Sequence, residues 1–319
     1  MAEVSLLDDL ATYGPSGTAA APSLDEARAY CRRLARRHYE NFSVASFLLP
    51  RELRQHFYNV YAYCRWADDL ADETGDPARS LALLEWWGER LRDCYRGETR
   101  HPVFVALRDT ITTFAIPAEP FLDLLSAFEQ DQTTTRYATF DELLGYCRRS
   151  ANPVGRLVLH LGRCCDERRA GLSDLICTGL QLANFWQDVR RDRAIGRVYL
   201  PQDSLRRFGV EESELDAPQA SPAFKRLLAF EVDRAEECLR RGLPLVDEMP
   251  RRLGGDVWLF AHGGLKILEK IRQLDFDVLA GRPKVSKADQ FKLLGGCLWR
   301  QVRGGKMPGN AVLSNRVRA

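Results

Sequence analysis

The sequence predicts an all-α fold with one large domain over residues 23–303. Two capping-box signatures, Ser23–Glu26 and Thr139–Glu142, each stand at the start of a segment whose apolar residues recur with helical spacing. Convincing runs of alternating apolar and polar residues, which would predict half-buried strands, are missing, and so are internal repeats. At 319 residues the chain is long enough to bury most of the surface that it exposes when unfolded.

The helices can be placed in chain order from caps, prolines and apolar spacing. Residues 1–22 end in a run rich in Gly, Ser and Ala and are predicted to be a disordered arm, and residues 304–319 a frayed basic tail. Pro50 suits a first helical turn and introduces a helix through about Asp72. Pro153 predicts a kink within its helix. Further helices are expected at 81–95, 120–131, 141–163, 173–192, 222–248, 257–280 and 286–303.

Composition limits the function classes. A net charge of +2 gives no reason to expect nucleic acid as a partner. The nine cysteines include no C-x-x-C pair, which favours reduced packing residues in a cytoplasmic protein. The first residues are acidic where a signal peptide would be basic, and no apolar run approaches the length of a membrane span. Basic residues near the C-terminus could rest on the inner face of the membrane, although a solvated surface explains them equally well.

A polar stripe on a largely apolar helix is the most informative feature of the sequence. It lies in the stretch QLANFWQDVRRD and consists of Gln181, Asn184, Asp188 and Asp192. Their spacings of three, four and four place them within about 80° of one another on a helix. Most of the other residues around the circumference of this helix are apolar, which predicts that the helix is largely buried. Carboxylates there need cations or hydrogen-bond partners, because desolvated like charges repel strongly.

A second stripe of the same kind lies in the stretch YNVYAYCRWADDLAD. Its members are Tyr61, Arg65, Asp68 and Asp72. They fall within roughly 60° of one helical face, with Asp69 beside them. Either stripe alone could be an ordinary solvated face, but two of them in one all-α chain are harder to explain in that way.

If the two helices face one another, their carboxylates surround a small volume and predict a cation site. Oxygen-only ligands favour Mg²⁺, which typically links protein carboxylates to substrate phosphates. The sequence therefore predicts a diphosphate ligand with arginines nearby. A di-iron bundle would need Glu-x-x-His on helices, and the single match, Glu98–His101, lies between Gly97 and Pro102 in an expected loop.

The two stretches, with RVYLP just after the second, resemble the squalene/phytoene synthase family of class I isoprenoid synthases from about His38 to Pro201. The resemblance implies an all-α isoprenoid synthase bundle around a central cavity, an isoprenoid diphosphate substrate and Mg²⁺ as cofactor. It implies catalytic roles for Asp68, Asp72, Asp188, Asp192 and Tyr199. The implied metal ligands are Asp68, Asp72, Asn184, Asp188 and Asp192. The implied contacts of the substrate or its diphosphate are His38, Asn41, Ser43, Tyr61, Arg65, Tyr146, Gln181, Gln187 and Arg197.

Family members ionise an allylic or cyclopropylcarbinyl diphosphate, so a closed apolar cavity must keep bulk water from the carbocation. Aromatic faces would stabilise that cation, and each could equally be ordinary core. The aromatic candidates are Phe42, Phe47, Tyr58, Tyr61, Tyr146, Phe185 and Trp186.

Three departures from the condensing members of the family refine the expected substrate. Glu40 stands where those members usually carry a basic residue, Asn152-Pro153 replaces a small pair, and Gln187 replaces an arginine. Condensing two farnesyl diphosphates means binding two diphosphates, whereas an enzyme that starts from presqualene diphosphate binds one and needs fewer cations. The pattern resembles the hydroxysqualene synthase branch of the bacterial hopanoid route, in which water captures the cation. Asn152, Gln181 or Gln187 could place that water.

Three alternatives stay open. A condensing synthase would make presqualene diphosphate, squalene or phytoene from farnesyl or geranylgeranyl diphosphate. A terpene cyclase shares the Asn184, Asp188 and Asp192 spacing but fits RVYLP and Gln181 poorly. A non-catalytic helical protein could bind isoprenoid diphosphates beside other members of the squalene and hopanoid route.

Overall fold

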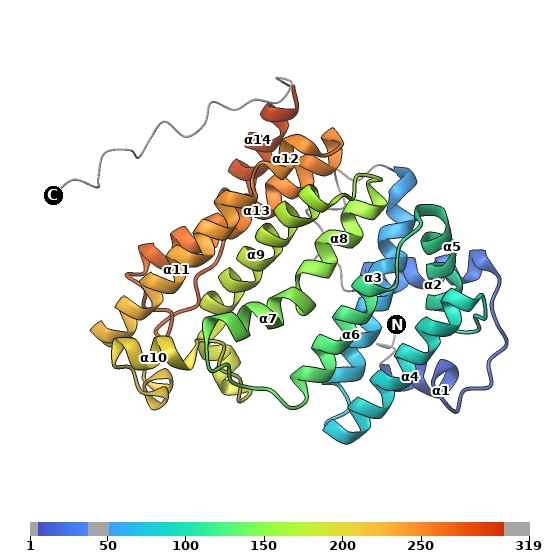
Figure 1. Cartoon of the computed structure of the whole chain (residues 1–319), viewed down its shortest axis with the longest axis horizontal. Helices are drawn as coiled ribbons and strands as arrows, with labels where there is room; N and C mark the ends of the chain where they lie inside the picture. Colours follow the sequence, from blue (N-terminus) through green and yellow to red (C-terminus); the bar gives the residue numbers. More distant parts are fainter. Residues whose placement is uncertain (1–5, 38–50, 303–319) are drawn as a thin grey trace.

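The computed structural model describes residues 6–37 and 51–302, and every regular element within them is helical (Figure 1). The all-α prediction is therefore confirmed. The elements are α1 (Leu6–Tyr13), α2 (Leu24–Arg37), α3 (Arg51–Asp72), α4 (Pro77–Arg96), α5 (Pro102–Phe114), α6 (Glu119–Asp131), α7 (Phe140–Ser150), α8 (Asn152–Leu161), α9 (Glu167–Ala194), α10 (Gln202–Phe208), the 3₁₀ helix η3 (Glu212–Asp216), α11 (Pro222–Gly242), α12 (Leu245–Glu248), α13 (Arg251–Gln273) and α14 (Lys287–Val302).

Several boundaries differ from the predicted ones. The helix expected at 141–163 is two helices, because the chain breaks at Ala151 and Pro153 then occupies the first turn of α8. The helix expected at 222–248 stops at Gly242, and the next long helix starts at Arg251. Helix α9 extends beyond 173–192 at both ends, starting after the Asp166 side chain, which accepts a hydrogen bond from the Arg169 amide.

Three helices are not among the predicted ones. Helix α5 starts with an unusual cap, the His101 ring, which accepts a hydrogen bond from the Val103 amide. Helix α10 is only seven residues long. Helix α1 lies within the predicted disordered arm. There the Tyr30 hydroxyl donates to Asp9, and the Tyr13 ring packs edge-on against Tyr30.

The long helix α9 lies at the centre of the bundle, beside α8, α11 and α13 (Figure 1). The Trp186 ring is completely buried, and its indole N–H donates to the Glu231 carbonyl on α11. Gly179 allows α11 to come close, since a Cβ there would lie 2.7 Å from Leu239 Cγ. Close packing of this kind fixes the rotation of α9 and therefore the direction of its polar stripe.

The same hydrophobic core continues where α3 packs against α4 and α5. The Trp66 and Trp87 rings stack with their centroids 5.2 Å apart, and the His101 ring packs edge-on against both. Burial lowers the pKa of His101 to about 3, so this histidine is neutral and structural. This core holds α3 with its own polar stripe directed away from Trp66.

Among the described helices, none combines the length and the apolar character that crossing a bilayer requires.

Candidate active site

The stripe on α3 carries its charges as a connected group. The Arg65 guanidinium lies 3.2 Å from the Asp68 carboxylate and also forms an ion pair with Asp69. The Asp68 side chain is 43% exposed and the Asp72 side chain 58%, so both remain accessible to a ligand. Partial burial nevertheless raises the pKa of Asp68, and the neighbouring Asp72 carboxylate adds to this effect, while Arg65 opposes it.

The stripe on α9 runs from a cavity to an acidic end. Gln181 and Asn184 line the cavity, and Asp188 and Asp192 follow along the same helix. The Asp188 carboxylate is held by two hydrogen bonds from Arg282, of which the Nη2–Oδ2 contact is 2.9 Å. Burial and the Asp188 charge raise the pKa of Asp192 to about 7, against the pull of Arg197.

Arg197 connects the two stripes. Its guanidinium lies 3.7 Å from the Asp72 carboxylate on α3. Burial raises the pKa values of Asp68 and Asp192, and the positive charge of Arg197 opposes both increases. Acids from both stripes therefore interact electrostatically with Arg197. The structure therefore brings the two predicted stripes toward one another around a shared cation.

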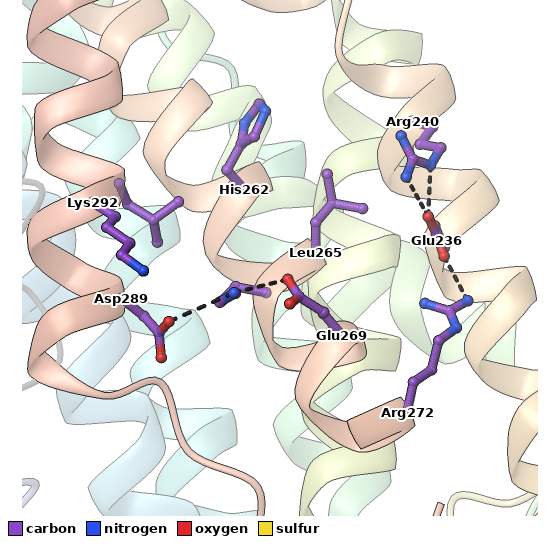
Figure 2. Close-up of a pocket in the computed structure, with 10 residues that line it drawn as sticks. Glu236, Arg240, His262, Leu265, Glu269, Arg272, Asp289 and Lys292 are labelled. Atoms are coloured by element: carbon purple, nitrogen blue, oxygen red, sulfur yellow. Dashed lines mark hydrogen bonds and ion pairs between the residues drawn. The ribbon is translucent and has the colours of Figure 1, made fainter. Parts of the chain in front are cut away.

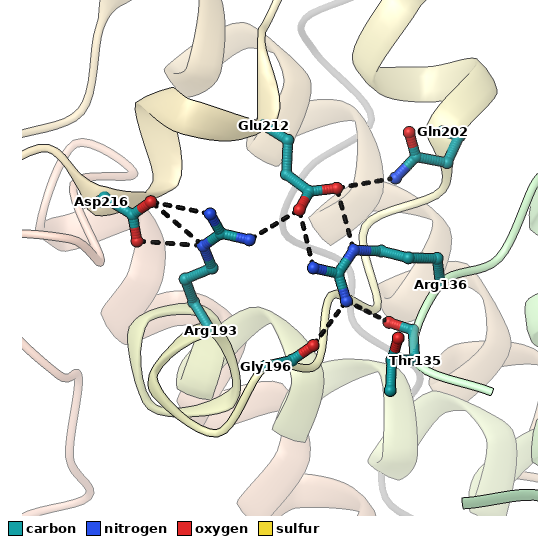
Figure 3. Close-up of polar contacts among 7 residues, drawn as sticks. All are labelled: Thr135, Arg136, Arg193, Gly196, Gln202, Glu212 and Asp216. Atoms are coloured by element: carbon teal, nitrogen blue, oxygen red, sulfur yellow. Dashed lines mark hydrogen bonds and ion pairs between the residues drawn. The ribbon is translucent and has the colours of Figure 1, made fainter. Parts of the chain in front are cut away.

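The loop that carries Arg197 is fixed by a network of ion pairs, which Figure 3 shows. Arg193 binds Asp216 and Glu212, and Glu212 also receives two hydrogen bonds from Arg136. Arg136 in turn donates to the Gly196 carbonyl within the loop. Backbone bonds add to this, since the Val198 amide donates to Thr135 and the Arg197 amide to Asp192. Arg193 is thus engaged in holding the loop, not in contacting the acidic stripes.

Aromatic rings pack beneath this loop. The Tyr199 ring stacks on Phe185 with the centroids 3.8 Å apart and also lies parallel to the Tyr137 and Tyr146 rings. The Tyr146 hydroxyl donates to Asp131 at 2.9 Å. Burial raises the pKa of Tyr199 to about 12, so its hydroxyl keeps its proton at neutral pH.

Two adjacent cavities open beside the stripes. The first, of about 410 Å³, is lined almost wholly by apolar side chains of α3, α8, α9 and α13 and includes Tyr61. The second, of about 710 Å³, reaches Gln181, Asn184 and Gln187. The two share the lining residues Val154, Cys177, Leu180, Asp256 and Phe260. Space of this size suits a long apolar chain next to a polar head.

Some predicted residues have other roles in the structure. The Gln187 side chain is buried and donates to the Pro283 carbonyl at 2.6 Å. Asn152 lies outside both cavities and accepts a hydrogen bond from Thr178. Trp186 is core and not a cavity residue. Residues outside the described part of the chain include Phe42, Phe47 and three of the predicted contacts, His38, Asn41 and Ser43.

Two charged residues at this site were missed from the sequence. Asp131 lies near Arg197, and its pKa is raised to about 6, chiefly by burial. The sequence feature that could have identified Asp131 is its position at the end of α6. A carboxylate is unfavourable at a helix C-terminus, so its presence there suggests a functional role. Arg282 lies 94 residues after Asp188 in the chain, and no local sequence pattern predicts that these two residues form an ion pair.

The donor chemistry of the stripes fits a hard divalent cation, because every candidate ligand is a carboxylate or amide oxygen. Within the described residues, no three His, Cys, Asp or Glu side chains form a group that could hold an ion unaided. Two of the proposed ligands form ion pairs with arginines instead. Arg65 contacts Asp68, and Arg282 contacts Asp188. The raised pKa values of Asp68 and Asp192 indicate that further positive charge would be favourable.

A separate polar cavity of about 370 Å³ lies between α11, α13 and α14 (Figure 2). Its acids are all paired within the cavity wall. Glu236 binds Arg240 and Arg272, while Lys266 bridges Glu269 and Asp289. These contacts join α11 to α13 and α13 to α14, and the cavity shares no lining residue with the acidic stripes.

Comparison with known proteins agrees with this geometry. The hydroxysqualene synthase of Rhodopseudomonas palustris is 39% identical over 240 residues, which cover 74% of this chain and 80% of that protein. The crystal structure of squalene synthase HpnC from Alicyclobacillus acidocaldarius is 46% identical with a TM-score of 0.76, covering 79% of this chain and 95% of that one. A dehydrosqualene synthase in complex with a ligand is 25% identical with a TM-score of 0.78, covering 88% and 98%.

A family model, squalene/phytoene synthase, matches residues 35–289. That span contains both acidic stripes, the loop with Arg197 and Tyr199, and most of the residues that line the two adjacent cavities. The chain belongs to the squalene/phytoene synthase family.

Proposed function

We propose that the protein is a hydroxysqualene synthase, which converts presqualene diphosphate and water to hydroxysqualene and pyrophosphate. The main observation behind this proposal is that the two acidic stripes approach one another at Arg197. Beside them lie an apolar cavity and an adjoining cavity whose lining includes the amide side chains of Gln181, Asn184 and Gln187. The names of two relatives, the Rhodopseudomonas palustris hydroxysqualene synthase and HpnC, support this branch of the family. The uncharged Gln187 supports a substrate with a single diphosphate.

The ligands proposed for Mg²⁺ are Asp68, Asp72, Asn184, Asp188 and Asp192. When bound, Mg²⁺ supplies positive charge that stabilises the leaving diphosphate. Arg65, Arg197 and Arg282 already face the same acids, and we propose that they would bind oxygens of the diphosphate. The protonated Tyr199 hydroxyl would donate to the diphosphate from the loop that covers it.

The apolar cavity protects the carbocation. Its walls exclude bulk water, and Tyr61 offers an aromatic face beside the acidic end of α3. The hydrocarbon tails would lie along Val60, Leu157 and Leu253, away from the acids. Water then reaches the cation only at a defined place, so that the alcohol forms in preference to uncontrolled products.

We further propose that the protein contacts a membrane with the rim of these cavities. Val154 and Phe260 line both cavities and are 47% and 43% exposed, and Phe291 on α14 is 73% exposed. Lys287 and Lys292 on α14 would bind anionic headgroups. Co-sedimentation with vesicles containing anionic lipid tests this, and a Phe260→Ser/Phe291→Ser variant that binds as well as the parent protein would contradict it.

The decisive experiment is product identification. The purified protein with Mg²⁺ is incubated with presqualene diphosphate or with farnesyl diphosphate, each with and without NADPH. Hydroxysqualene from presqualene diphosphate alone is the expected result. Turnover of farnesyl diphosphate alone would instead favour a condensing synthase, and binding of both diphosphates without turnover would favour a non-catalytic binding protein.

A further inference from the structure

Asp256 on α13 is a buried acid whose carboxyl group has no partner among the described residues. It is 5% exposed, and neither carboxylate oxygen accepts a hydrogen bond from residues 6–37 or 51–302. By contrast, the buried acid Glu231 accepts hydrogen bonds from Ser204 and Arg234. Leaving a carboxyl group unsatisfied in the interior costs folding free energy, so its presence calls for a reason other than stability.

The location of Asp256 supplies that reason. It lines both the apolar cavity and the cavity that reaches Gln181 and Asn184, and among the described residues that line either cavity it is the single acid. It therefore lies where the hydrocarbon end of the site meets the polar end. Because none of the described residues around it is a partner, a molecule in the cavity can supply one.

The surroundings of Asp256 are otherwise uncharged. The titratable side chains around it in the described part of the chain are Tyr61, Cys64 and Cys177, which line the same apolar cavity, and Cys297 on α14, whose pKa is raised by burial and by the Asp256 charge. Burial alone raises the pKa of Asp256 to about 8, with no arginine or lysine to oppose it. A carbocation formed in the cavity would stabilise the carboxylate form at the moment when a base is needed.

We propose that Asp256 binds the water molecule that captures the carbocation and accepts the proton which that water releases. The inference rests on the proposed function. The water oxygen donates an electron pair to the cationic carbon, a C–O bond forms, and one O–H bond of the resulting oxonium breaks. Its proton passes to the Asp256 carboxylate, and the products are the neutral alcohol and the protonated Asp256.

The amides expected from the sequence are less suited to this role. The Gln187 amide already donates to the Pro283 carbonyl, and the Asn152 oxygen already accepts from Thr178. Gln181 lines the cavity and can orient water, but an amide does not accept a proton near neutral pH. Asp256 combines hydrogen bonding with a titratable oxygen.

The test measures alcohol formed per pyrophosphate released from presqualene diphosphate. Asp256→Leu replaces the carboxyl group with a branched apolar group and so removes the oxygens, and we expect pyrophosphate release to persist while the alcohol share falls at least tenfold in favour of hydrocarbon. Asp256→Asn should give an intermediate share, and Asp256→Glu should restore most of it. In the parent protein the share should rise between pH 7 and pH 9, and in Asp256→Asn it should not change.

Glu231→Gln is the matched control, because it alters a buried acid remote from both cavities. It should leave the alcohol share unchanged even if the protein is less stable. An unchanged alcohol share in Asp256→Leu would overturn the role of Asp256, and parent-like values in Asp256→Asn would overturn proton acceptance. If the parent protein forms no alcohol from presqualene diphosphate, the proposed function itself is wrong.

Discussion

At the scale of single residues, arginines from distant parts of the chain contact one acid of each stripe. Arg282 binds Asp188 from the segment between α13 and α14, and Arg197 lies beside Asp72 from the loop after α9. Each of these arginines fixes the position of the carboxylate that it contacts. In the proposed function, metal and diphosphate would exchange partners within this group of acids and arginines, and the raised pKa values of Asp68 and Asp192 indicate that the added positive charge would be favourable.

Asp188 provides the first prediction. Asp188→Asn removes a charge that we propose binds both Mg²⁺ and, through Arg282, the diphosphate. We expect kcat to fall by roughly 10²–10³-fold, as when a major electrostatic contact of a transition state is lost. Pyrophosphate release under saturating Mg²⁺ measures this.

Asp174→Asn is its control. Asp174 lies on the same helix and pairs with Arg156 far from the stripe. Its activity should match that of the parent protein. Full activity in Asp188→Asn would remove Asp188 from the catalytic group.

At the scale of elements, the loop that carries Arg197 depends on contacts with segments on either side. Arg136 precedes α7, whereas Glu212 and Asp216 belong to η3 (Figure 3). These ion pairs are partly exposed, so their contribution to the free energy of unfolding is small. Their importance is positional, because they determine where Arg197 and Tyr199 lie.

Arg193→Ala should therefore reduce kcat/KM by roughly tenfold with little change in thermal stability, since a small displacement of a binding group has a large kinetic effect. Steady-state kinetics and a melting curve test both parts. Arg168→Ala breaks a comparable pair with Glu248, remote from the site, and should leave the kinetics unchanged. Equal kinetics in the two variants would contradict a positioning role for Arg193.

The position of α9 relative to α11 depends on Gly179. A Cβ at this position would lie 2.7 Å from Leu239 Cγ and 3.0 Å from the Leu239 backbone nitrogen, so one of the helices must shift. We expect Gly179→Ala to lower the free energy of unfolding by about 1–3 kcal/mol. Gly171 on the same helix has open space around it, so Gly171→Ala should raise that free energy by about 0.5–1 kcal/mol. Urea unfolding that shows the same sign for both variants would disprove the packing explanation.

At the scale of the whole molecule, the site makes the fold less stable as pH rises. The pKa of Asp256 is about 8 in the folded protein, above its ordinary value near 4, so the native state binds more protons than the unfolded state between these values. The free energy of unfolding therefore falls as pH increases through this window. Buried acids at the site are retained at a cost in stability.

Asp256→Asn does not titrate and should remove its part of this dependence. The variant should gain roughly 2–5 kcal/mol relative to the parent protein on going from pH 5 to pH 9. Melting temperatures at several pH values, without Mg²⁺ or substrate, measure the difference. A constant offset between the two proteins over this range would show that Asp256 does not titrate there.

The sequence by itself determined the fold class, both polar stripes and the loop that follows the second. These properties are local: helical periodicity places Asp68 with Asp72, and Asp188 with Asp192, on one face whatever the rest of the chain does. It did not determine the break at Ala151 or helix α5, because a single proline and a histidine cap are weak local signals.

Only the tertiary structure decided which charged side chains form ion pairs and which buried carboxyl group has no opposite charge beside it. Arg282 reaches Asp188 across 94 residues, and Arg193 belongs to the network around Glu212 although it is adjacent to Asp192 in sequence. Asp256 is one acid among 44 in the sequence and appears as an unpaired group between two cavities only once α13 is packed. Burial and electrostatic pairing depend on contacts between distant segments, and no local pattern specifies those contacts.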